Sequence, residues 1–142
     1  MSTPHENQAV IEKLVDAINT GEIARVASEF ITDNLVRHDL TDPPADEGGS
    51  SGVTDLMRRL RAASPDLQFE IVDIFANEDR VALHYIMTGT HQGHFLGVTP
   101  SGRRFQLHGV NLYRLENGKV VETWQLGDVL GFMTQVGAVN LE

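Results

Sequence analysis

An Asn-Gly turn between two long strand-like runs is the feature that most constrains how this chain of 142 residues folds. The runs cover residues 104–115 and 120–126, and Asn117-Gly118 lies between them. Asn-Gly between two β runs is the strongest short signal for a hairpin, because both residues tolerate the positive φ angles of the tight turn. We therefore predict a pair of long antiparallel strands in the second half of the chain.

Further strands are predicted just before this hairpin, and helices before those. Leu67, Phe69 and Ile71 alternate with polar residues, and another strand-like run covers 81–88. Apolar residues recur at helical spacing earlier in the chain, which predicts helices over 7–19, 22–30 and 53–63. We expect residues 31–40, which mix β-branched residues with turn formers, to cross an open end of the fold. Residues 127–137 are expected to close the chain as a short helix.

Helices followed by hairpin-linked strands are typical of an α+β domain. The length suits one domain, which we place over 1–142. We predict three N-terminal helices packed on a strongly curved antiparallel sheet, with a cone-shaped pocket between the two layers. The segment 41–52 is rich in Pro, Gly, Ser and Asp; it is either a solvated loop or a lid over this pocket.

The charge balance and the lack of cysteine exclude several function classes. Eleven Lys and Arg against 20 Asp and Glu give a net charge of −9, which argues against nucleic acid and anionic membranes as partners. Without cysteine there is no disulfide, thiolate metal site or thiol nucleophile. Residues 1–8 lack the layout of a signal peptide, and no apolar run approaches the roughly 18 residues of a membrane span. We therefore expect a soluble cytoplasmic protein with a small, uncharged or weakly charged ligand.

One acidic residue, Asp128, follows the last predicted strand in apolar surroundings. Leu126 precedes it and Val129-Leu130 follow it, so we expect its carboxylate to be partly desolvated. Desolvation makes a carboxylate a better base for an acidic carbon between two carbonyl groups. The alternative is that Asp128 caps the C-terminal helix.

Two polar residues of the preceding strand, His108 and Asn111, are candidates for stabilising the enolate that such a proton transfer forms. They are an odd number of residues apart, so both face the same side only if a bulge at Gly109 shifts the alternation. We predict His108 as the donor or proton partner and Asn111 as a contact to the substrate. A solvated strand histidine is the alternative for His108.

His91 and His94 have the spacing of a metal-binding pair, but no third ligand follows at a telling spacing. We therefore predict no metal site. Trp124 is most simply a core residue, although its ring could also form the wall of a pocket for a polycyclic ligand.

A set of residues distributed over most of the chain supports a more specific interpretation. It comprises Asp33-Asn34, Val36-Arg37-His38, Asp66 after Ser64-Pro65, Gly89-Thr90-His91, Gly93, Phe95-Leu96-Gly97, Pro100-Ser101-Gly102-Arg103, Tyr113-Arg114, Asn117-Gly118-Lys119, Glu122, Trp124, Asp128 and Leu130-Gly131. Together with the order of the elements, this set resembles the SnoaL-like polyketide cyclase family, which has the nuclear transport factor two-like, or ketosteroid isomerase-like, fold.

The resemblance implies an intramolecular aldol ring closure on a hydrophobic carbonyl substrate, a polyketide ester, without metal or cofactor. The family's acid and base is an aspartate that matches Asp128. His38 resembles a family position near the pocket and His91 resembles one in the family's strand-end motif, so the resemblance makes both candidates for contact with the substrate. It also implies a homodimer that forms through the exposed face of the sheet.

Two alternatives stay open. A ketosteroid isomerase-like site would pair a base with a tyrosine and a protonated aspartate. Asp39 could take the place of the base, but Tyr85 and Tyr113 lie on predicted strands rather than on the first helix. A non-catalytic protein of the same fold would instead bind a hydrophobic ligand or act as a dimerising scaffold.

Overall fold

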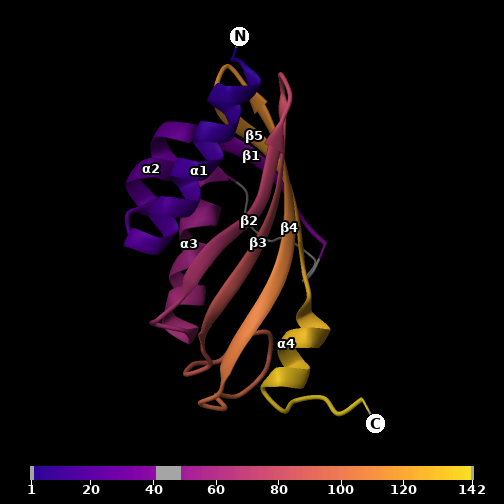
Figure 1. The fold of residues 1–142 in the computed structure, drawn as a ribbon. Helices are drawn as coiled ribbons and strands as arrows, with labels where there is room; N and C mark the ends of the chain where they lie inside the picture. Colours follow the sequence, from indigo (N-terminus) through magenta and orange to yellow (C-terminus); the bar gives the residue numbers. More distant parts are fainter. Residues whose placement is uncertain (1, 41–48, 142) are drawn as a thin grey trace.

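The computed structural model describes residues 2–40 and 49–141. Within these ranges the elements are α1 (Pro4–Thr20), α2 (Ile23–Phe30), β1 (Ile31–Asp39), α3 (Gly49–Ala63), β2 (Gln68–Ala76), β3 (Arg80–Thr90), β4 (Arg104–Glu116), β5 (Lys119–Gly127) and α4 (Val129–Gln135). Helices α1, α2 and α3 lie along one side of the sheet, and α4 lies beside the far end of β4 (Figure 1). The predicted α+β architecture with three N-terminal helices on a sheet is confirmed.

The sheet is mixed rather than purely antiparallel, and it is not closed. Its strand order is β1-β5-β4-β3-β2, and β1 pairs with β5 in parallel. The expectation that residues 31–40 cross an open end of the fold is therefore wrong. Ile31 and Leu35 are buried in the core, and this burial holds the segment against the helices as an edge strand.

The helix boundaries follow local capping chemistry. Thr3 caps α1 by accepting a hydrogen bond from the backbone N–H of Glu6, and Gly21 ends the helix at a φ of 81°. Helix α3 begins at Gly49, so the end of the predicted loop over 41–52 is helical. The rest of that loop, 41–48, lies outside the described residues.

The strand β4 defines the two faces of the sheet. Phe105, Leu107 and Leu115 are buried against the helix layer, whereas Gln106 and His108 are exposed. We call the side that packs against the helices the inner face and the opposite side the outer face. Strand residues alternate between the two, so this strand contributes its odd-numbered residues to the inner face.

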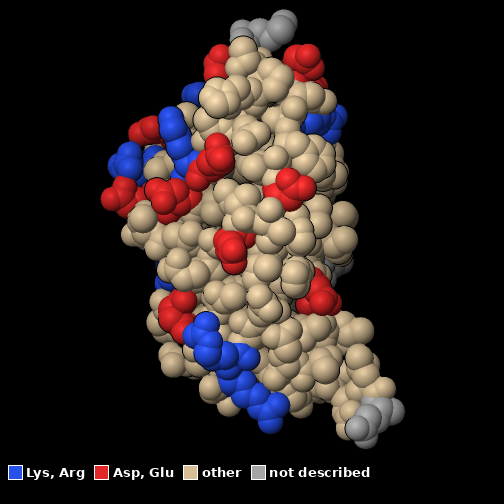
Figure 2. All heavy atoms as spheres, viewed as in Figure 1, with Lys and Arg blue, Asp and Glu red and all other residues tan. Residues whose placement is uncertain are grey.

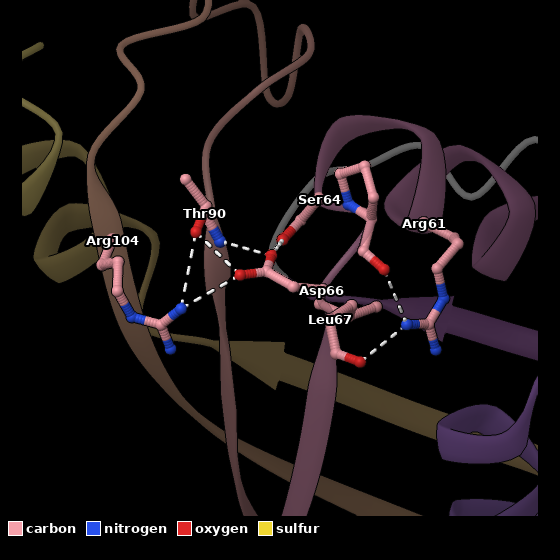
Figure 3. Close-up of polar contacts among 7 residues, drawn as sticks. Arg61, Ser64, Asp66, Leu67, Thr90 and Arg104 are labelled. Atoms are coloured by element: carbon pink, nitrogen blue, oxygen red, sulfur yellow. Dashed lines mark hydrogen bonds and ion pairs between the residues drawn. The ribbon is translucent and has the colours of Figure 1, made fainter.

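Polar contacts around Asp66 join the end of the helix layer to the sheet (Figure 3). The carboxylate accepts hydrogen bonds from the backbone N–H and the hydroxyl of Thr90, at 2.8 and 2.7 Å, and pairs with Arg104 at 3.0 Å. The hydrogen bonds from Thr90 hold the pKa of Asp66 at about 2, below its ordinary value of 3.8. Arg61 adds a second link, because it donates to the carbonyls of Leu67 and Ile18.

Helix α4 completes the sheet where β5 leaves it. The last β5 partner of β4 is Gly127, opposite Gly109. Beyond that point the side-chain amide of Gln135 accepts from the backbone N–H of Gln106 at 2.7 Å and donates to its carbonyl at 2.8 Å. This amide makes the two hydrogen bonds that a neighbouring strand would make. The side chain of Phe132 also holds α4 in place, since it is fully buried against Phe105.

The surface charges are unevenly distributed. Figure 2 shows acidic and basic groups mixed over the helix layer, a band of basic groups near the lower end, and between them a mostly uncharged area with a few separate acidic groups. In the described part of the chain, no helix is both long and apolar enough to span a membrane.

Candidate active site

A cavity of about 400 Å³ lies between the helix layer and the inner face of the sheet. Its walls are mostly apolar and include Leu14, Ile18, Leu56, Leu83, Phe95 and Leu107. This volume falls within the usual range for sites that bind small molecules. The predicted pocket between helices and sheet is therefore present.

Polar side chains enter this cavity in two rows that cross β1, β5 and β4. In the first row, Asp39 pairs in register with Gln125, which pairs with Asn111. In the second row, Arg37 pairs with Thr123, which pairs with Tyr113. All six side chains line the cavity. We call these two sets the polar rows.

Asp39 is the single acidic side chain among the described residues that line the cavity. Its carboxylate lies 3.8 Å from the guanidinium of Arg37, and the two side chains are 15% and 3% exposed. Arg37 also donates to the carbonyl of Gly52 on α3. The pair thus places a carboxylate and a fixed positive charge at the wall of a largely apolar cavity, where electrostatic interactions are stronger than in water.

Two tyrosines supply hydroxyl groups to the same wall. The side-chain amide of Asn111 donates to the hydroxyl of Tyr113 at 3.1 Å. Burial raises the pKa of Tyr113 to about 12. Burial also raises the pKa of Tyr85 well above its ordinary value, and electrostatic interactions with Tyr113 and Asp39 add to this rise. Both phenols therefore keep their protons at neutral pH and can donate hydrogen bonds.

The polar rows contain side-chain oxygens that no described residue satisfies. Asn111 Oδ1, Thr123 Oγ1 and Gln125 Oε1 are buried and lack a hydrogen-bond partner within the described part of the chain. Leaving such groups unpaired costs about 1–3 kcal/mol each. A ligand that offers hydroxyl groups to these oxygens would recover that free energy.

Of the six site residues predicted from the sequence, Asn111 lines the cavity. His108 was expected to face the pocket, and that expectation is wrong. The alternation of β4 is regular through Gly109, so the buried Phe105 and Leu107 turn Asn111 inward and His108 outward. On the outer face, His108 Nδ1 lies 3.2 Å from His84 Nε2.

His38 and Trp124 also lie on the outer face and do not meet the cavity. They are register partners, and their rings stack with centroids 5.2 Å apart. His38 Nε2 lies 2.7 Å from the carboxylate of Glu122, which also accepts a hydrogen bond from Arg114. The expectation that His38 and Trp124 line the ligand pocket is therefore wrong.

Asp128 caps helix α4, as the alternative from the sequence proposed. Its carboxylate accepts a hydrogen bond from the backbone N–H of Gly131 at 2.9 Å, and the residue is exposed. The expected desolvation of Asp128 is therefore wrong. Its neighbours Gly127 and Val129 line the cavity, so the cap lies beside the pocket rather than in it.

His91 is buried below the loop that follows β3. Its Nδ1 lies 2.9 Å from the hydroxyl of Ser101, and its ring meets Phe132 edge-on at 5.4 Å. His91 is not among the cavity-lining residues, whereas His94 is. No group of three or more His, Asp or Glu in the described residues could hold a metal ion.

The cavity also contains functional candidates that the sequence did not point to. Arg37, Thr123 and Gln125 were not predicted, and Asp39, Tyr85 and Tyr113 entered only through an alternative. One signal was available: Tyr113 and Asn111 share the parity of the buried Phe105 and Leu107 along β4. No such signal was available for the cavity-lining residues of β1, because the sequence did not identify that segment as a strand.

Comparisons with known proteins agree with this architecture. A family model described as SnoaL-like polyketide cyclase matches residues 8–136. The aklanonic acid methyl ester cyclase DnrD of Streptomyces peucetius is 28% identical over 134 residues, which cover 90% of this chain and 88% of DnrD.

Two solved structures are similar over nearly their whole length. AclR of Streptomyces galilaeus, a proposed hydroxylase, is 32% identical with a TM-score of 0.82, and the match covers 97% of this chain and 100% of AclR. IdmH of Streptomyces antibioticus, a proposed polyketide cyclase, is 28% identical with a TM-score of 0.79, and the match covers 92% of this chain and 98% of IdmH.

Proposed function

Because the chain belongs to the SnoaL-like polyketide cyclase family and is an enzyme, we propose that it closes a ring in a polyketide ester by an aldol reaction inside the cavity. The observation that carries this proposal is the position of Asp39. Asp39 is the single acidic side chain among the described residues lining the cavity, and the cavity wall also holds the phenols of Tyr85 and Tyr113. An acid–base group beside hydrogen-bond donors is what an aldol reaction requires.

The proposed reaction moves one proton out and one proton back. Asp39 takes a proton from a carbon between two carbonyl groups, and the electron pair of the broken C–H bond moves onto a carbonyl oxygen as an enolate. The enolate carbon then attacks a second carbonyl of the same molecule and forms the new C–C bond. The resulting alkoxide receives the proton from Asp39, so the product is an isomer of the substrate and no cofactor is consumed.

The apolar walls support a hydrophobic substrate. Leucine, isoleucine and aromatic side chains surround the polar rows, which suits a polyketide with apolar rings and a few oxygen atoms at one side. Among the relatives, DnrD is named for aklanonic acid methyl ester. We propose an ester of this chemical class as the substrate and the cytoplasm as the place where it is converted.

The test compares Asp39→Asn with Asp128→Asn, using aklanonic acid methyl ester as the first substrate. Asp39→Asn keeps the size of the side chain and removes the base, so we expect kcat to fall about 10²–10⁴-fold. Asp128→Asn should change kcat by less than about tenfold, because an asparagine also caps a helix. If Asp128→Asn abolishes turnover and Asp39→Asn does not, the predicted role of Asp128 is correct and Asp39 serves only to pair with Arg37.

Hydroxylation is a second candidate function, favoured by the 32% identity to AclR. The mass of the product separates the two, since ring closure leaves the mass unchanged and hydroxylation adds one oxygen atom. Isomerisation of a carbonyl compound would use the same groups as the cyclisation, and NMR of the product distinguishes it by the absence of a new ring. A binding protein of this fold would show ligand binding without turnover.

We also propose that a second copy of the chain covers the outer face, as the resemblance implies. Exposed apolar side chains gather there, among them Val36, Val110 and Leu112. Apolar patches of this kind on a sheet mark sites of protein association. A homodimer formed in this way would leave the cavity on the inner face of each copy open to its substrate.

A further inference from the structure

Two glycines interrupt the inner face beside the polar rows. Gly109 on β4 pairs with Gly127 on β5 on one side and with Tyr85 on β3 on the other. These three register partners form a further row on the inner face, in which Tyr85 has a large side chain and the two glycines have none. The phenol of Tyr85 uses the free space, because a Cβ atom at position 109 would overlap with its Cζ and Oη atoms.

The ring of Tyr85 is held in this position from both sides. Phe69 on β2 contacts it with ring centroids 5.0 Å apart and planes inclined by 37°, and Gly109 lies under its hydroxyl end. The ring thus leans from β3 across β4, toward the strands that carry the polar rows. Both Tyr85 and Asp39 line the cavity.

We propose that Gly109 is a positioning residue, whose missing side chain lets Tyr85 reach the ligand carbonyl that becomes an enolate when Asp39 removes the proton. This inference rests on the proposed function and assigns one donor within it. The C–H electron pair moves onto the carbonyl oxygen, the proton goes to Asp39, and Tyr85 keeps its own proton while its hydrogen bond to the oxygen strengthens. The raised pKa of Tyr85 fits this role, because a protonated phenol can donate to the enolate at neutral pH.

A double-mutant cycle tests whether Gly109 acts through Tyr85. Tyr85→Phe removes the donor and should lower kcat about 10²–10³-fold. Gly109→Ala should also lower kcat, since the added methyl group displaces the phenol of Tyr85. In the Tyr85→Phe background, Gly109→Ala should have little further effect. Equal losses in both backgrounds would overturn the inference.

Gly89→Ala is the matched control. Gly89 is also a strand glycine, and a Cβ atom there would overlap with a side-chain atom of Ser64, but Gly89 does not line the cavity. We expect Gly89→Ala to lower the thermal unfolding midpoint and to leave kcat close to wild type. Should Gly109→Ala lose its fold, Phe69→Leu tests the position of Tyr85 from the other side of the ring. It should lower kcat in the wild-type background and have no further effect after Tyr85→Phe.

Binding of 2-naphthol gives a readout that does not depend on turnover. Asp39→Asn is neutral, as Asp39 is after taking up the proton, and the naphtholate anion carries its charge on oxygen as an enolate does. Fluorescence distinguishes the anion from neutral naphthol. In the Asp39→Asn background, adding Tyr85→Phe or Gly109→Ala should weaken binding of the anion roughly 10–100-fold, whereas adding Gly89→Ala should not.

The two assays separate failure of the inference from failure of the proposed function. If no polyketide ester is turned over but the naphtholate pattern is as expected, the proposed cyclisation fails and the oxyanion site remains. If turnover depends on Asp39 but Tyr85→Phe and Gly109→Ala leave kcat and naphtholate binding unchanged, the function is supported and the inference is wrong.

Discussion

The inner and outer faces of the sheet carry different chemistry on the same strands. On β1, Asp39 lies at the cavity while its neighbour His38 stacks on Trp124 on the other side. On β4, Asn111 lies at the cavity while His108 meets His84 on the other side. Residues that look equally suited to catalysis in the sequence are thus separated by the thickness of the sheet.

This comparison shows that the face toward which a side chain points, more than its chemical type, determines whether the residue belongs to the site. Three of the histidine and tryptophan positions predicted as site residues belong to the outer face. There His38 stacks on Trp124 and pairs with Glu122, and His108 lies beside His84. The inner face holds the carboxylate, phenols and amides. We therefore expect changes on the two faces to affect different measurements.

The largest effect is expected from truncating a core leucine of β4. Leu115 is 2% exposed on the inner face, and Leu112 is 46% exposed on the outer face. Leu115→Ala should lower the free energy of unfolding by about 2–5 kcal/mol, whereas Leu112→Ala should cost less than about 1 kcal/mol. Urea unfolding at low protein concentration measures both. Equal losses would mean that the outer face is buried as deeply as the core.

The next effect concerns activity on the same strand. Asn111→Leu removes the amide that orients the hydroxyl of Tyr113, and we expect kcat to fall about 10–100-fold. His108→Leu should leave kcat within about twofold, because the residue faces away from the cavity. Steady-state kinetics of the two variants checks this. A larger loss for His108→Leu would restore the role that the sequence suggested for it.

A smaller effect is expected on association. Leu112→Glu places a charge in the middle of the outer face and should shift a homodimer toward the monomer, as measured by light scattering. Leu130→Glu is the matched control, since Leu130 is an exposed leucine on α4. If both variants keep the mass of the wild-type protein, a second copy does not use the outer face.

The smallest effect concerns the ion pairs of the outer face. Hydrogen bonds from His38 and then from Arg114 lower the pKa of Glu122 below its ordinary value of 4.5. The folded state therefore binds this proton less readily than the unfolded state, so the stabilisation is present above pH 4.5 and is lost as the pH falls. Glu122→Gln should lower the urea midpoint slightly at neutral pH, and the difference should shrink in acid. A difference that does not vary with pH would contradict this account.

The sequence predicted most of the elements because their patterns are regular. The hairpin at Asn117-Gly118 joins β4 and β5 as expected, with both residues at positive φ. The three N-terminal helices follow their apolar spacing, and the closing segment forms α4. Local patterns of this kind are determined by a few neighbouring residues.

The faces of β4 and the pairing of β1 could not be predicted in the same way. Along β4, Phe105 and Leu107 favour one parity while Val110 and Leu112 favour the other, so both faces look apolar and the pattern does not decide which side is buried. The segment of β1 is a strand because it pairs with β5, far along the chain. Asp39 could be assigned to the cavity only after that pairing was known.

The amide of Gln135 also has a consequence for solubility. An unpaired strand edge is a template on which other chains can add strands, and natural proteins protect such edges. Gln135 occupies the backbone groups of Gln106 where β5 no longer does. A single side chain thus keeps one stretch of β4 from serving as a seed for intermolecular aggregation. This protection is a role of the C-terminal helix that is separate from catalysis.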